Sequence, residues 1–295
     1  MSDFRLKVFQ SVAKNLSFTK ASQELFVSQP AITKHIQELE ATYQTRLFDR
    51  QGSKISLTES GRLLLEHCER ILEEYKRLEY EMHLLHNEYI GELKLGASTT
   101  IAQYVLPPLL GSFIGKFPQV NLSLLNGNSR EIEAALQEHR IDLGLVEGVF
   151  RLPNLKYTTF LEDELVAVVH SKSRLQLPEE ITPQDLPAIP LVLRERGSGT
   201  LDVIERSLQK HGVKLSSLHV LMYLGSTESI KLFLENSDCM GIVSIRSICK
   251  ELAAGTFRVV EIKDMPMLRD FSFVQLQGQE GGLSQAFMNY MFMSR

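Results

Sequence analysis

The chain has 295 residues, 43% of them hydrophobic and 23% charged, so its composition is that of an ordinary globular protein with two or three domains. Its 32 basic and 36 acidic residues give a net charge of −4, which excludes a polycation that binds nucleic acid through bulk charge. Three scattered cysteines are too few for a disulfide framework or a zinc cluster, and they suit a reducing compartment. There is no apolar run of membrane-spanning length and no signal-peptide pattern. We therefore expect a cytoplasmic protein without a cofactor or a resident metal.

Charge varies along the chain and divides it into three parts. Residues 1–62 carry a net +3, residues 63–90 a net −4 and residues 91–295 a net −3. Proline and glycine are scarce in the first two parts and frequent in the third. Any contact with DNA should therefore come from the N-terminal part.

The first 43 residues contain three helical patterns, at about 4–14, 18–25 and 29–43. Ser28 is a suitable N-cap for the third helix, and Pro30 falls in its first turn, where a missing N–H costs nothing. The apolar positions of this helix share one face, so its polar positions face outward. Two short helices with a brief link form the helix-turn-helix plan, in which the second helix enters the major groove.

The outward side chains of the third helix suit DNA recognition. Gln can pair with adenine, Lys can donate to guanine, and Ser or Thr can contact either base. Residues 47–58 indicate two short strands around a glycine turn, a wing whose basic side chains can hold phosphates. The predicted DNA-binding residues are Ser28, Gln29, Pro30, Thr33, Lys34, Gln37, Arg50, Ser53 and Lys54. The competing interpretation is a three-helix packing or dimerisation module with solvated polar faces.

Five motifs then stand in order at fixed spacing. They are Ser17-Phe18-Thr19-Lys20-Ala21-Ser22, Ser28-Gln29-Pro30-Ala31-Ile32-Thr33-Lys34-His35-Ile36, Leu39-Glu40, Leu47-Phe48-Asp49-Arg50 and Leu57-Thr58-Glu59-Ser60-Gly61. This run resembles the winged helix-turn-helix of the LysR-type transcriptional regulators over about 60 residues. The family commonly has glycine in a turn where this chain has Thr45. The resemblance implies a DNA-binding domain at residues 1–58.

A long linker and dimerisation helix should follow, at residues 59–90. Its 31 residues up to Tyr89 would form a rod of ~46 Å. Apolar residues recur at alternating steps of 3 and 4, at Gly61, Leu64, Cys68, Ile71, Tyr75, Leu78, Met82, Leu85 and Tyr89. This repeat favours a left-handed two-helix seam over a helix that lies on the surface of its own domain. We predict a homodimer held at Leu64, Ile71, Tyr75, Leu78, Met82 and Leu85, with its winged modules on two DNA half-sites.

Beyond residue 91, short apolar runs alternate with helical patterns, which is typical of an α/β architecture with mainly parallel sheets. Strands are predicted at 92–97, 120–125, 142–147, 164–170, 189–193, 219–224, 240–245, 257–262 and 271–276. Helices are predicted at about 100–116, 129–139, 200–211, 227–236, 246–254 and 284–294. The region has 205 residues, more than one small sheet requires, which favours two lobes with a cleft.

This region resembles the effector domain of the LysR type, which is similar to the two-lobed periplasmic binding proteins. The resemblance implies an effector-binding domain at 91–295. One lobe would comprise about 91–161 and 265–295, the other about 162–264, and two crossover strands would join them. It also implies a sequence-specific regulator of transcription, not an enzyme, that binds operator DNA and a small effector, contacts RNA polymerase and forms dimers or tetramers.

Ligands of such sheets bind beyond the carboxyl ends of strands, at helix N-termini. Hydroxyl-bearing segments follow several strands here, with backbone N–H groups that favour anions. The predicted effector-binding residues are Ser98, Thr99, Thr100, Asn128, Ser129, Glu147, Ser198, Thr200 and Thr227. Plain helix capping is the competing explanation. Glu147 would either bond a ligand donor or repel an anion, which argues against a bare, highly charged anion as the only ligand.

The Ser-Thr-Thr, Glu-Gly and Arg-Glu-x-Gly-Ser-Gly-Thr motifs are similar to those of a subgroup that regulates sulfur assimilation and carbon fixation. That subgroup often has arginine after the last threonine, where this chain has Leu201. A hydrolase that uses Ser198 is a weaker alternative, because Gly-Ser-Gly is not the Gly-x-Ser-x-Gly elbow and no His–acid pair can be assigned to it. A ligand-independent DNA-binding protein is another. We expect a regulator whose effector is a small anion.

Overall fold

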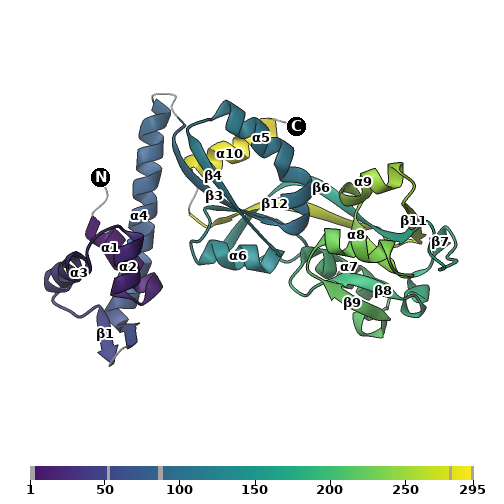
Figure 1. Ribbon diagram of the computed structural model, residues 1–295, viewed down its shortest axis with the longest axis horizontal. Coiled ribbons are helices and arrows are strands. Elements are labelled where there is room, and N and C mark those ends of the chain that lie inside the picture. The colour runs from purple at the N-terminus through teal and green to yellow at the C-terminus, as the bar shows by residue number, and fades with distance from the viewer. Residues whose placement is uncertain (1–3, 52–53, 86–88, 279–280, 294–295) are drawn as a thin grey trace. The chain divides into compact units, whose positions relative to one another are not determined.

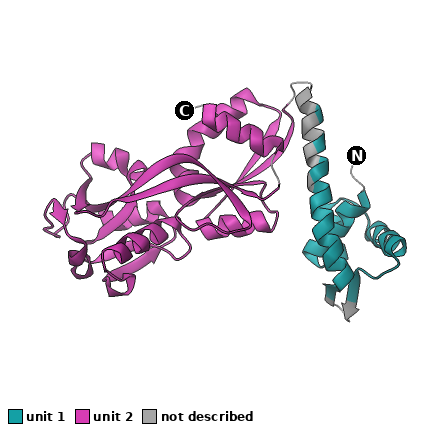
Figure 2. Cartoon of the chain, turned by 180° about the vertical axis from the view of Figure 1, so that it is seen from behind, with its two compact units in different colours: residues 1–88 teal, residues 89–295 magenta. Residues whose placement is uncertain are grey.

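The computed structural model describes residues 4–51, 54–85, 89–278 and 281–293. Contacts divide the chain into two compact units, residues 1–88 and 89–295 (Figures 1 and 2). Some predicted positions lie outside the described residues. These are the whole of Ser53 and the side chains of Arg50, Lys54 and Leu85.

The first unit is helical with a small hairpin. Its elements are α1 (Phe4–Asn15), α2 (Phe18–Glu24), α3 (Gln29–Tyr43), β1 (Phe48–Gln51), β2 (Lys54–Leu57) and α4 (Glu59–Leu85). The two strands pair antiparallel, with Phe48 opposite Leu57. The three predicted helices and the wing strands are thus confirmed.

Capping side chains set the helix boundaries of this unit. Ser17 and Ser28 have extended backbones, and their hydroxyls accept hydrogen bonds from Lys20 N at 3.2 Å and Ala31 N at 3.4 Å. Helix α3 ends at Tyr43, because the next residue, Gln44, has a left-handed φ of 51° that stops the helix.

The beginning of α4 is part of the core of its own unit. Gly61 lies so close to Leu47 that a Cβ would be 2.1 Å from the Leu47 carbonyl oxygen. Cys68 is fully buried, and its thiol donates to the Leu6 carbonyl oxygen at 3.2 Å. Burial raises the pKa of this thiol to about 12. Leu72 is buried in the same cluster.

The prediction of one continuous seam along α4 is therefore wrong for its first half. Gly61, Leu64 and Cys68 contact the winged module, whereas Ile71 and Leu78 are 42% and 52% exposed. A helix that packs on its own domain shows the same apolar stripe as a helix that packs on a second copy, because both need only one apolar face. Spacing alone could not separate the two.

The predicted end of the linker helix is also wrong. The described part of α4 runs to Leu85, and Tyr89 is not helical. The Tyr89 ring lies 4.5 Å from the Phe117 ring, centroid to centroid, against the core of the second unit. Tyr89 therefore belongs to the effector part of the chain.

The second unit holds one mixed sheet, which has ten strands among the described residues. They are β3 (Gly91–Ser98), β4 (Val120–Gly127), β5 (Leu143–Glu147), β6 (Leu155–His170), β7 (Glu180–Ile181), β8 (Leu191–Arg194), β9 (Val220–Leu224), β10 (Met240–Ser244), β11 (Phe257–Ile262) and β12 (Met267–Leu276). Their order is β4-β3-β5-β12-β6-β10-β8-β9, with β11 beside β6 and β7 beside β11.

Strands β6 and β12 cross the unit and pair antiparallel along their length (Figure 1). One end joins the parallel set β4-β3-β5, and the other joins the parallel set β10-β8-β9. The expectation of mainly parallel sheets is therefore wrong for the joining strands, whereas the two crossover strands are present. The first half of β6 mixes apolar and polar residues, so the sequence pattern predicts only the second half, where the run Leu165–Val169 is continuously apolar.

Helices cover both strand sets. They are the π-helical turn η1 (Ile101–Val105), α5 (Leu106–Lys116), α6 (Ser129–Gln137), the 3₁₀ turns η2 (Pro183–Ala188) and η3 (Leu215–Ser217), α7 (Gly199–Lys210), α8 (Thr227–Glu235), α9 (Ile245–Ala253) and α10 (Gly282–Met293). The predicted helices are confirmed, except that the first is divided between η1 and α5.

Separate hydrophobic cores lie around the two strand sets. One contains Leu95, Phe113, Phe271 and Phe287, so α10 returns to the first set. Another contains Leu191 and residues of α7 and β10. We call the parts around β3–β5 and around β8–β10 lobe one and lobe two. The residue numbers at which the lobes divide remain a prediction.

None of the described helices has the length and apolar character that a bilayer crossing requires. Within the same residues, no group of three or more His, Cys, Asp or Glu side chains is placed to hold a metal ion.

The packing of Gly61 gives a first prediction. Gly61→Ala should lower the urea midpoint of the winged unit, because the new Cβ meets backbone rather than a movable side chain. The free energy of unfolding of this unit should fall by about 1–3 kcal/mol or more. The control is Gly111→Ala in α5, where a Cβ meets nothing within 4 Å and the better helix former should add about 0.5–1 kcal/mol. A midpoint of the winged unit in Gly61→Ala equal to that of the wild-type protein would contradict this packing. Circular dichroism during urea titration measures both.

Candidate functional site

In the first unit, the predicted DNA-reading side chains share one face of α3. The exposed ones are Ser28, Gln29, Pro30, Lys34 and Gln37. Thr33 is partly buried, and its hydroxyl donates to the Gln29 carbonyl oxygen at 3.1 Å. The opposite face is buried, so the helix offers its polar side to a partner.

In the second unit, predicted effector residues from both lobes converge on Glu147 at the end of β5. The buried Glu147 carboxylate accepts hydrogen bonds from Ser98 Oγ at 3.1 Å, Thr100 Oγ1 at 3.1 Å and Thr200 Oγ1 at 3.2 Å. Ser129 Oγ donates to the Glu147 carbonyl oxygen at 2.8 Å. The hydroxyls that the sequence offers to an anion thus already hold a carboxylate of the protein itself.

Three buried residues outside the predicted set, Asp163, Ser244 and Arg269, complete this arrangement. Arg269 Nη1 lies 3.1 Å from Glu147 Oε1 and donates to Thr200 Oγ1 at 2.8 Å. Arg269 Nε donates to Asp163 Oδ2 at 2.8 Å, and Ser244 Oγ donates to Asp163 Oδ1 at 2.7 Å. Each buried charge therefore has an opposite charge and hydrogen bonds, as a low-dielectric interior requires. We call Ser98, Thr100, Glu147, Asp163, Thr200, Ser244 and Arg269 the Glu147 network.

No local motif marks Arg269 or Asp163 in the sequence. They lie on the two crossover strands, and the antiparallel register sets them directly opposite each other. A cross-strand pair of opposite charges more than a hundred residues apart becomes visible only when the pairing is known. Charged neighbours hide both residues, since Asp163 stands between Glu162 and Glu164 and Arg269 is followed by Asp270.

Glycines allow the two lobes to touch beside Glu147. A Cβ on Gly199 would be 1.9 Å from the Glu147 carbonyl oxygen. A Cβ on Gly148, whose φ is 122°, would be 3.0 Å from Gly199 Cα. Only glycine permits this approach of backbone to backbone. Next to it, Arg130 N donates to the Gly197 carbonyl oxygen at 3.3 Å.

A second contact between the lobes involves Arg194 at the end of β8. Arg194 Nη2 donates to Thr99 Oγ1 and to the Gly225 carbonyl oxygen, each at 3.3 Å, and Nε pairs with Glu195 at 2.8 Å. Arg194 is 1% exposed, and its Nη1 has no hydrogen-bond partner within the described part of the chain. The predicted set omits Arg194, although the Arg-Glu motif contains it. A buried guanidinium with a free donor is a candidate for ligand contact.

A third contact links the π-helical turn of lobe one to α8. Tyr104 Oη donates to Glu228, which also pairs with Lys231 at 2.9 Å, and Lys231 lies 2.6 Å from Glu251. Burial and the bond to Glu228 raise the pKa of Tyr104 well above its usual range. π-helical turns are rare and often occur at functional positions.

Two predicted effector residues, Asn128 and Ser198, have contacts of the capping kind. Asn128 forms a capping box with Glu131, and Ser198 Oγ accepts from Leu201 N at 3.1 Å. Thr227 is a buried residue of the first turn of α8, a helix capped by Ser226. None of the described hydrogen bonds of Asn128 and Ser198 reaches the Glu147 network, so capping accounts for what the structure shows of these two residues.

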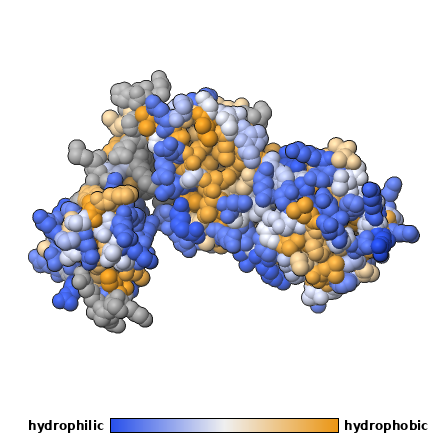
Figure 3. All heavy atoms as spheres, in the orientation of Figure 1, coloured by the Kyte–Doolittle hydropathy of each residue, from blue (hydrophilic) through white to orange (hydrophobic). Residues whose placement is uncertain are grey.

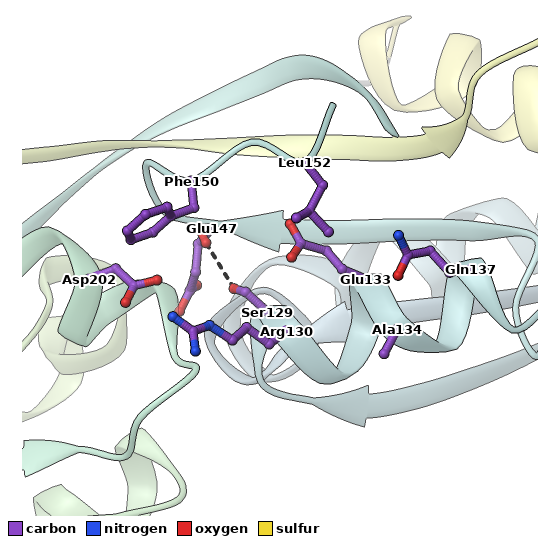
Figure 4. A pocket seen from close by; sticks show the side chains of 9 residues that line it. All are labelled: Ser129, Arg130, Glu133, Ala134, Gln137, Glu147, Phe150, Leu152 and Asp202. Atoms are coloured by element: carbon purple, nitrogen blue, oxygen red, sulfur yellow. Dashed lines mark hydrogen bonds between the residues drawn. The ribbon is translucent and has the colours of Figure 1, made fainter. Parts of the chain in front are cut away.

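A cavity of about 320 Å³ adjoins Glu147 (Figure 4). Lobe one supplies most of the wall, from α6 and the segment after β5, and Asp202 of α7 comes from lobe two. The lining residues are Ser129, Arg130, Glu133, Ala134, Gln137, Glu147, Phe150, Leu152 and Asp202. Only two of them, Ser129 and Glu147, belong to the predicted effector set.

Known proteins are similar to the chain over nearly its whole length. The family described as "Bacterial regulatory helix-turn-helix protein, lysR family" matches residues 4–62, and the "LysR substrate binding domain" matches residues 86–292. The chain belongs to the LysR family of transcriptional regulators. It is 30% identical to the HTH-type transcriptional regulator CysL of Bacillus subtilis, over 91% of this chain and 89% of CysL.

Solved structures agree with this assignment. The CcmR regulatory domain of Synechocystis PCC6803, solved in complex with 2-PG, is 28% identical with a TM-score of 0.62, over 69% of this chain and 97% of that domain. CbnR, a full-length structure with its target DNA, shares the fold with a TM-score of 0.62 at 23% identity and covers both chains completely.

This LysR-family chain is therefore a DNA-binding regulator with an effector-binding domain. The hydrolase alternative fails, because members of the family regulate transcription and are not enzymes. Ser198 caps α7 instead of facing a general base, and its oxygen accepts a backbone N–H.

The pairing of buried charges gives a second prediction. Arg269→Gln should destabilise the effector domain by about 3–5 kcal/mol, because it leaves the buried Glu147 carboxylate without a cation and leaves Asp163 with only Arg246, whose Nε lies 3.5 Å away. The matched control is Arg140→Gln, which breaks an exposed 2.7 Å pair with Glu138 and should cost at most about 1 kcal/mol. Thermal unfolding of both full-length variants measures the difference. Similar losses would show that the Glu147 network contributes no more than a surface pair.

Proposed function

We propose that this LysR-family regulator reads its operator with α3 and responds to a small metabolite with an anionic group, bound between the lobes of the effector domain. The observation that carries the effector half is Arg194, a buried guanidinium with an unpartnered Nη1 at a contact between the lobes. The relative CcmR was solved with 2-PG, which supports a small ligand in such a domain.

For DNA, we assign base and phosphate contacts to the exposed polar face of α3 and to the wing. The reading residues are Ser28, Gln29, Pro30, Thr33, Lys34 and Gln37, with Arg50, Ser53 and Lys54 on the wing. Support comes from the exposure of the helix face and from the net +3 of residues 1–62 in an otherwise acidic chain. Base-edge contacts give specificity, and phosphate contacts fix the register.

We assign dimerisation to the second half of α4. There Ile71, Leu78 and Met82 are exposed and Tyr75 is partly buried at heptad spacing, and Leu85 continues the repeat. Leu64 contributes less than the repeat indicates, since it already packs in its own unit. An exposed row of large apolar side chains on a long helix needs a partner, and a second copy supplies an identical row.

Apolar side chains on the effector domain support further pairing into a tetramer. They lie on the edge strands β4 and β9 and on the helices beside them: Ile114, Leu124, Leu125, Leu221, Met222, Tyr223 and Leu232. Figure 3 shows apolar residues gathered on both lobes. Edge strands with exposed apolar residues are prone to pair.

Ligand binding in the effector domain would then shift the equilibrium between two arrangements of the oligomer. A ligand shifts such an equilibrium only by its difference in affinity for the two states. The contacts of Thr99 and Tyr104 with lobe two, and of Thr200 with Glu147 of lobe one, are the ones that a change of lobe angle would alter. The output would be a changed bend or spacing on DNA and contact with RNA polymerase, in the cytoplasm.

The DNA assignment gives a third prediction. Gln29→Ala and Lys34→Ala should each weaken binding to a duplex that the wild-type protein selects from a random pool. Loss of a base-reading side chain should weaken the binding free energy by about 1–3 kcal/mol. Loss of a phosphate contact should instead lower the salt dependence of binding by about one ion. Lys14→Ala is the control, because Lys14 lies on α1 and pairs with Glu69. Fluorescence anisotropy over a salt series measures the affinities. Unchanged affinity in both variants would refute the assignment of α3.

The effector assignment gives a fourth prediction. Sulfate, sulfite, thiosulfate, phosphate and short carboxylates should be tested by thermal unfolding of the full-length protein. A ligand present at a hundredfold over its Kd adds ~2.7 kcal/mol, which raises the midpoint measurably. The rise should vanish in Arg194→Met and persist in Arg196→Met, whose side chain is 73% exposed. Binding that Arg194→Met leaves intact would place the anion elsewhere, and no rise with any anion would refute the anionic class.

A further inference from the structure

The cavity beside Glu147, which we call the α6–α7 cavity, is separate from the contacts around Arg194. Its wall contains none of Thr99, Arg194 or Thr227. Glu147 stands between the two places, since it lines the cavity and its carboxylate is held by Ser98 and Thr100. The approach of Gly199 to the Glu147 backbone closes the lobes at this point. A ligand in the cavity would therefore have its own set of contacts.

Three charged side chains line this cavity, apart from Glu147, and none is ion-paired with another described residue. Glu133 is 8% exposed, and only its Oε1 has a hydrogen bond, from Tyr157 Oη at 2.6 Å. Within the described part of the chain its Oε2 has no partner. Asp202 and Arg130 face each other across the cavity from α7 and α6 (Figure 4). Unpaired charges at a concave surface are costly unless a ligand complements them.

Burial disfavours the charged forms of the two acidic side chains, Glu133 and Asp202. Burial raises the pKa of Glu133, against the effects of Tyr157 and the nearby arginines. Burial also raises the pKa of Asp202, which Arg130 offsets only in part. A positively charged group between these carboxyls would relieve both, whereas an inorganic anion would be repelled by both.

Apolar surface completes the cavity. Phe150 is 64% exposed and Leu152 is 37% exposed, both on the segment that follows β5. The ring of Phe150 offers a flat face to a ligand and a partner for a nearby cation. At about 320 Å³ the space lies at the small end of ligand pockets, so the ligand should be small.

We propose that the α6–α7 cavity binds a zwitterion of the α-amino-acid class, as a second ligand site distinct from the anion site at Arg194. The ammonium group pairs with Glu133 and Asp202, the carboxylate pairs with Arg130, and an apolar side chain packs on Phe150 and Leu152. Because Asp202 belongs to lobe two and the other groups to lobe one, the ligand joins the lobes. The bound zwitterion therefore holds the two lobes together at this cavity, whether or not an anion is bound at Arg194.

The test compares three forms of one side chain. Thermal unfolding of the full-length protein against the twenty common amino acids at pH 7 identifies the best ligand. Calorimetric titration then compares that amino acid with its decarboxylated amine and its deaminated acid. The amino acid should bind most tightly, the amine more weakly and the acid not measurably. Binding of the acid alone, or of no amino acid or amine, would overturn the proposal while leaving the anion site at Arg194 untouched.

Isosteric variants locate the site. Asp202→Asn and Glu133→Gln should each weaken the amino acid about tenfold or more, and Arg130→Gln should abolish its advantage over the amine. Glu205→Gln is the matched control, since Glu205 lies one turn further along α7 and faces Arg196 instead of the cavity. Arg194→Met should leave amino-acid binding unchanged. Equal affinity in the Asp202, Glu133 and control variants would place the amino acid elsewhere and overturn the proposal.

Discussion

The contact between Arg269 and Glu147 is the one on which the effector domain depends most. A guanidinium and two carboxylates lie fully buried where both lobes and both crossover strands meet. Such a group of ions is tolerable only when every charge is paired and hydrogen-bonded, because its desolvation costs several kcal/mol per ion. The chain meets this condition with hydroxyls from four helix or strand ends. The end of β5, the start of α7 and the register of β6 with β12 must all be correct for the network to form.

A polar junction suits a domain that must move. An apolar interface of the same size would hold the lobes by burial alone and would be insensitive to a small ligand. Here the lobes are held by a few directional contacts, each made by a side chain such as Thr99, Tyr104 or Thr200. A ligand can replace one of these hydrogen bonds between the lobes with a hydrogen bond to itself. The exchange costs little free energy, because hydrogen bonds are replaced and not lost, and it changes the balance between the arrangements of the lobes. The sensitivity of the lobe arrangement to a small ligand therefore follows from the polar contacts between the lobes.

Local sequence signals predicted much of this structure. The helices, their serine and asparagine caps and the strand ends that carry hydroxyls follow from spacing and residue type, and Ser98, Thr100, Thr200 and Glu147 do meet. The sequence does not show which group these hydroxyls bind. The sequence predicts Glu147 as a neighbour of an anion site, whereas its own carboxylate is bound by those hydroxyls, with a cation supplied from a strand more than a hundred residues away. Long-range pairing of this kind leaves no periodic trace, so neither Arg269 nor Asp163 stood out.

Helix α4 shows the same limit in another form. Its apolar repeat is unbroken, yet Gly61, Leu64 and Cys68 serve the core of the winged module, whereas Ile71, Leu78 and Met82 are exposed. The change along the stripe occurs between Cys68 and Ile71, and Leu72, which is not on the stripe, is still buried. A small residue at position 61 and a thiol at position 68 suit contact with a globular domain, since Leu47 and Leu6 approach them closely. From Ile71 to Leu85, every position of the stripe is a large side chain. Residue size along the stripe, more than its period, therefore separates the part that folds with the DNA-binding module from the part that is free to pair with a second copy.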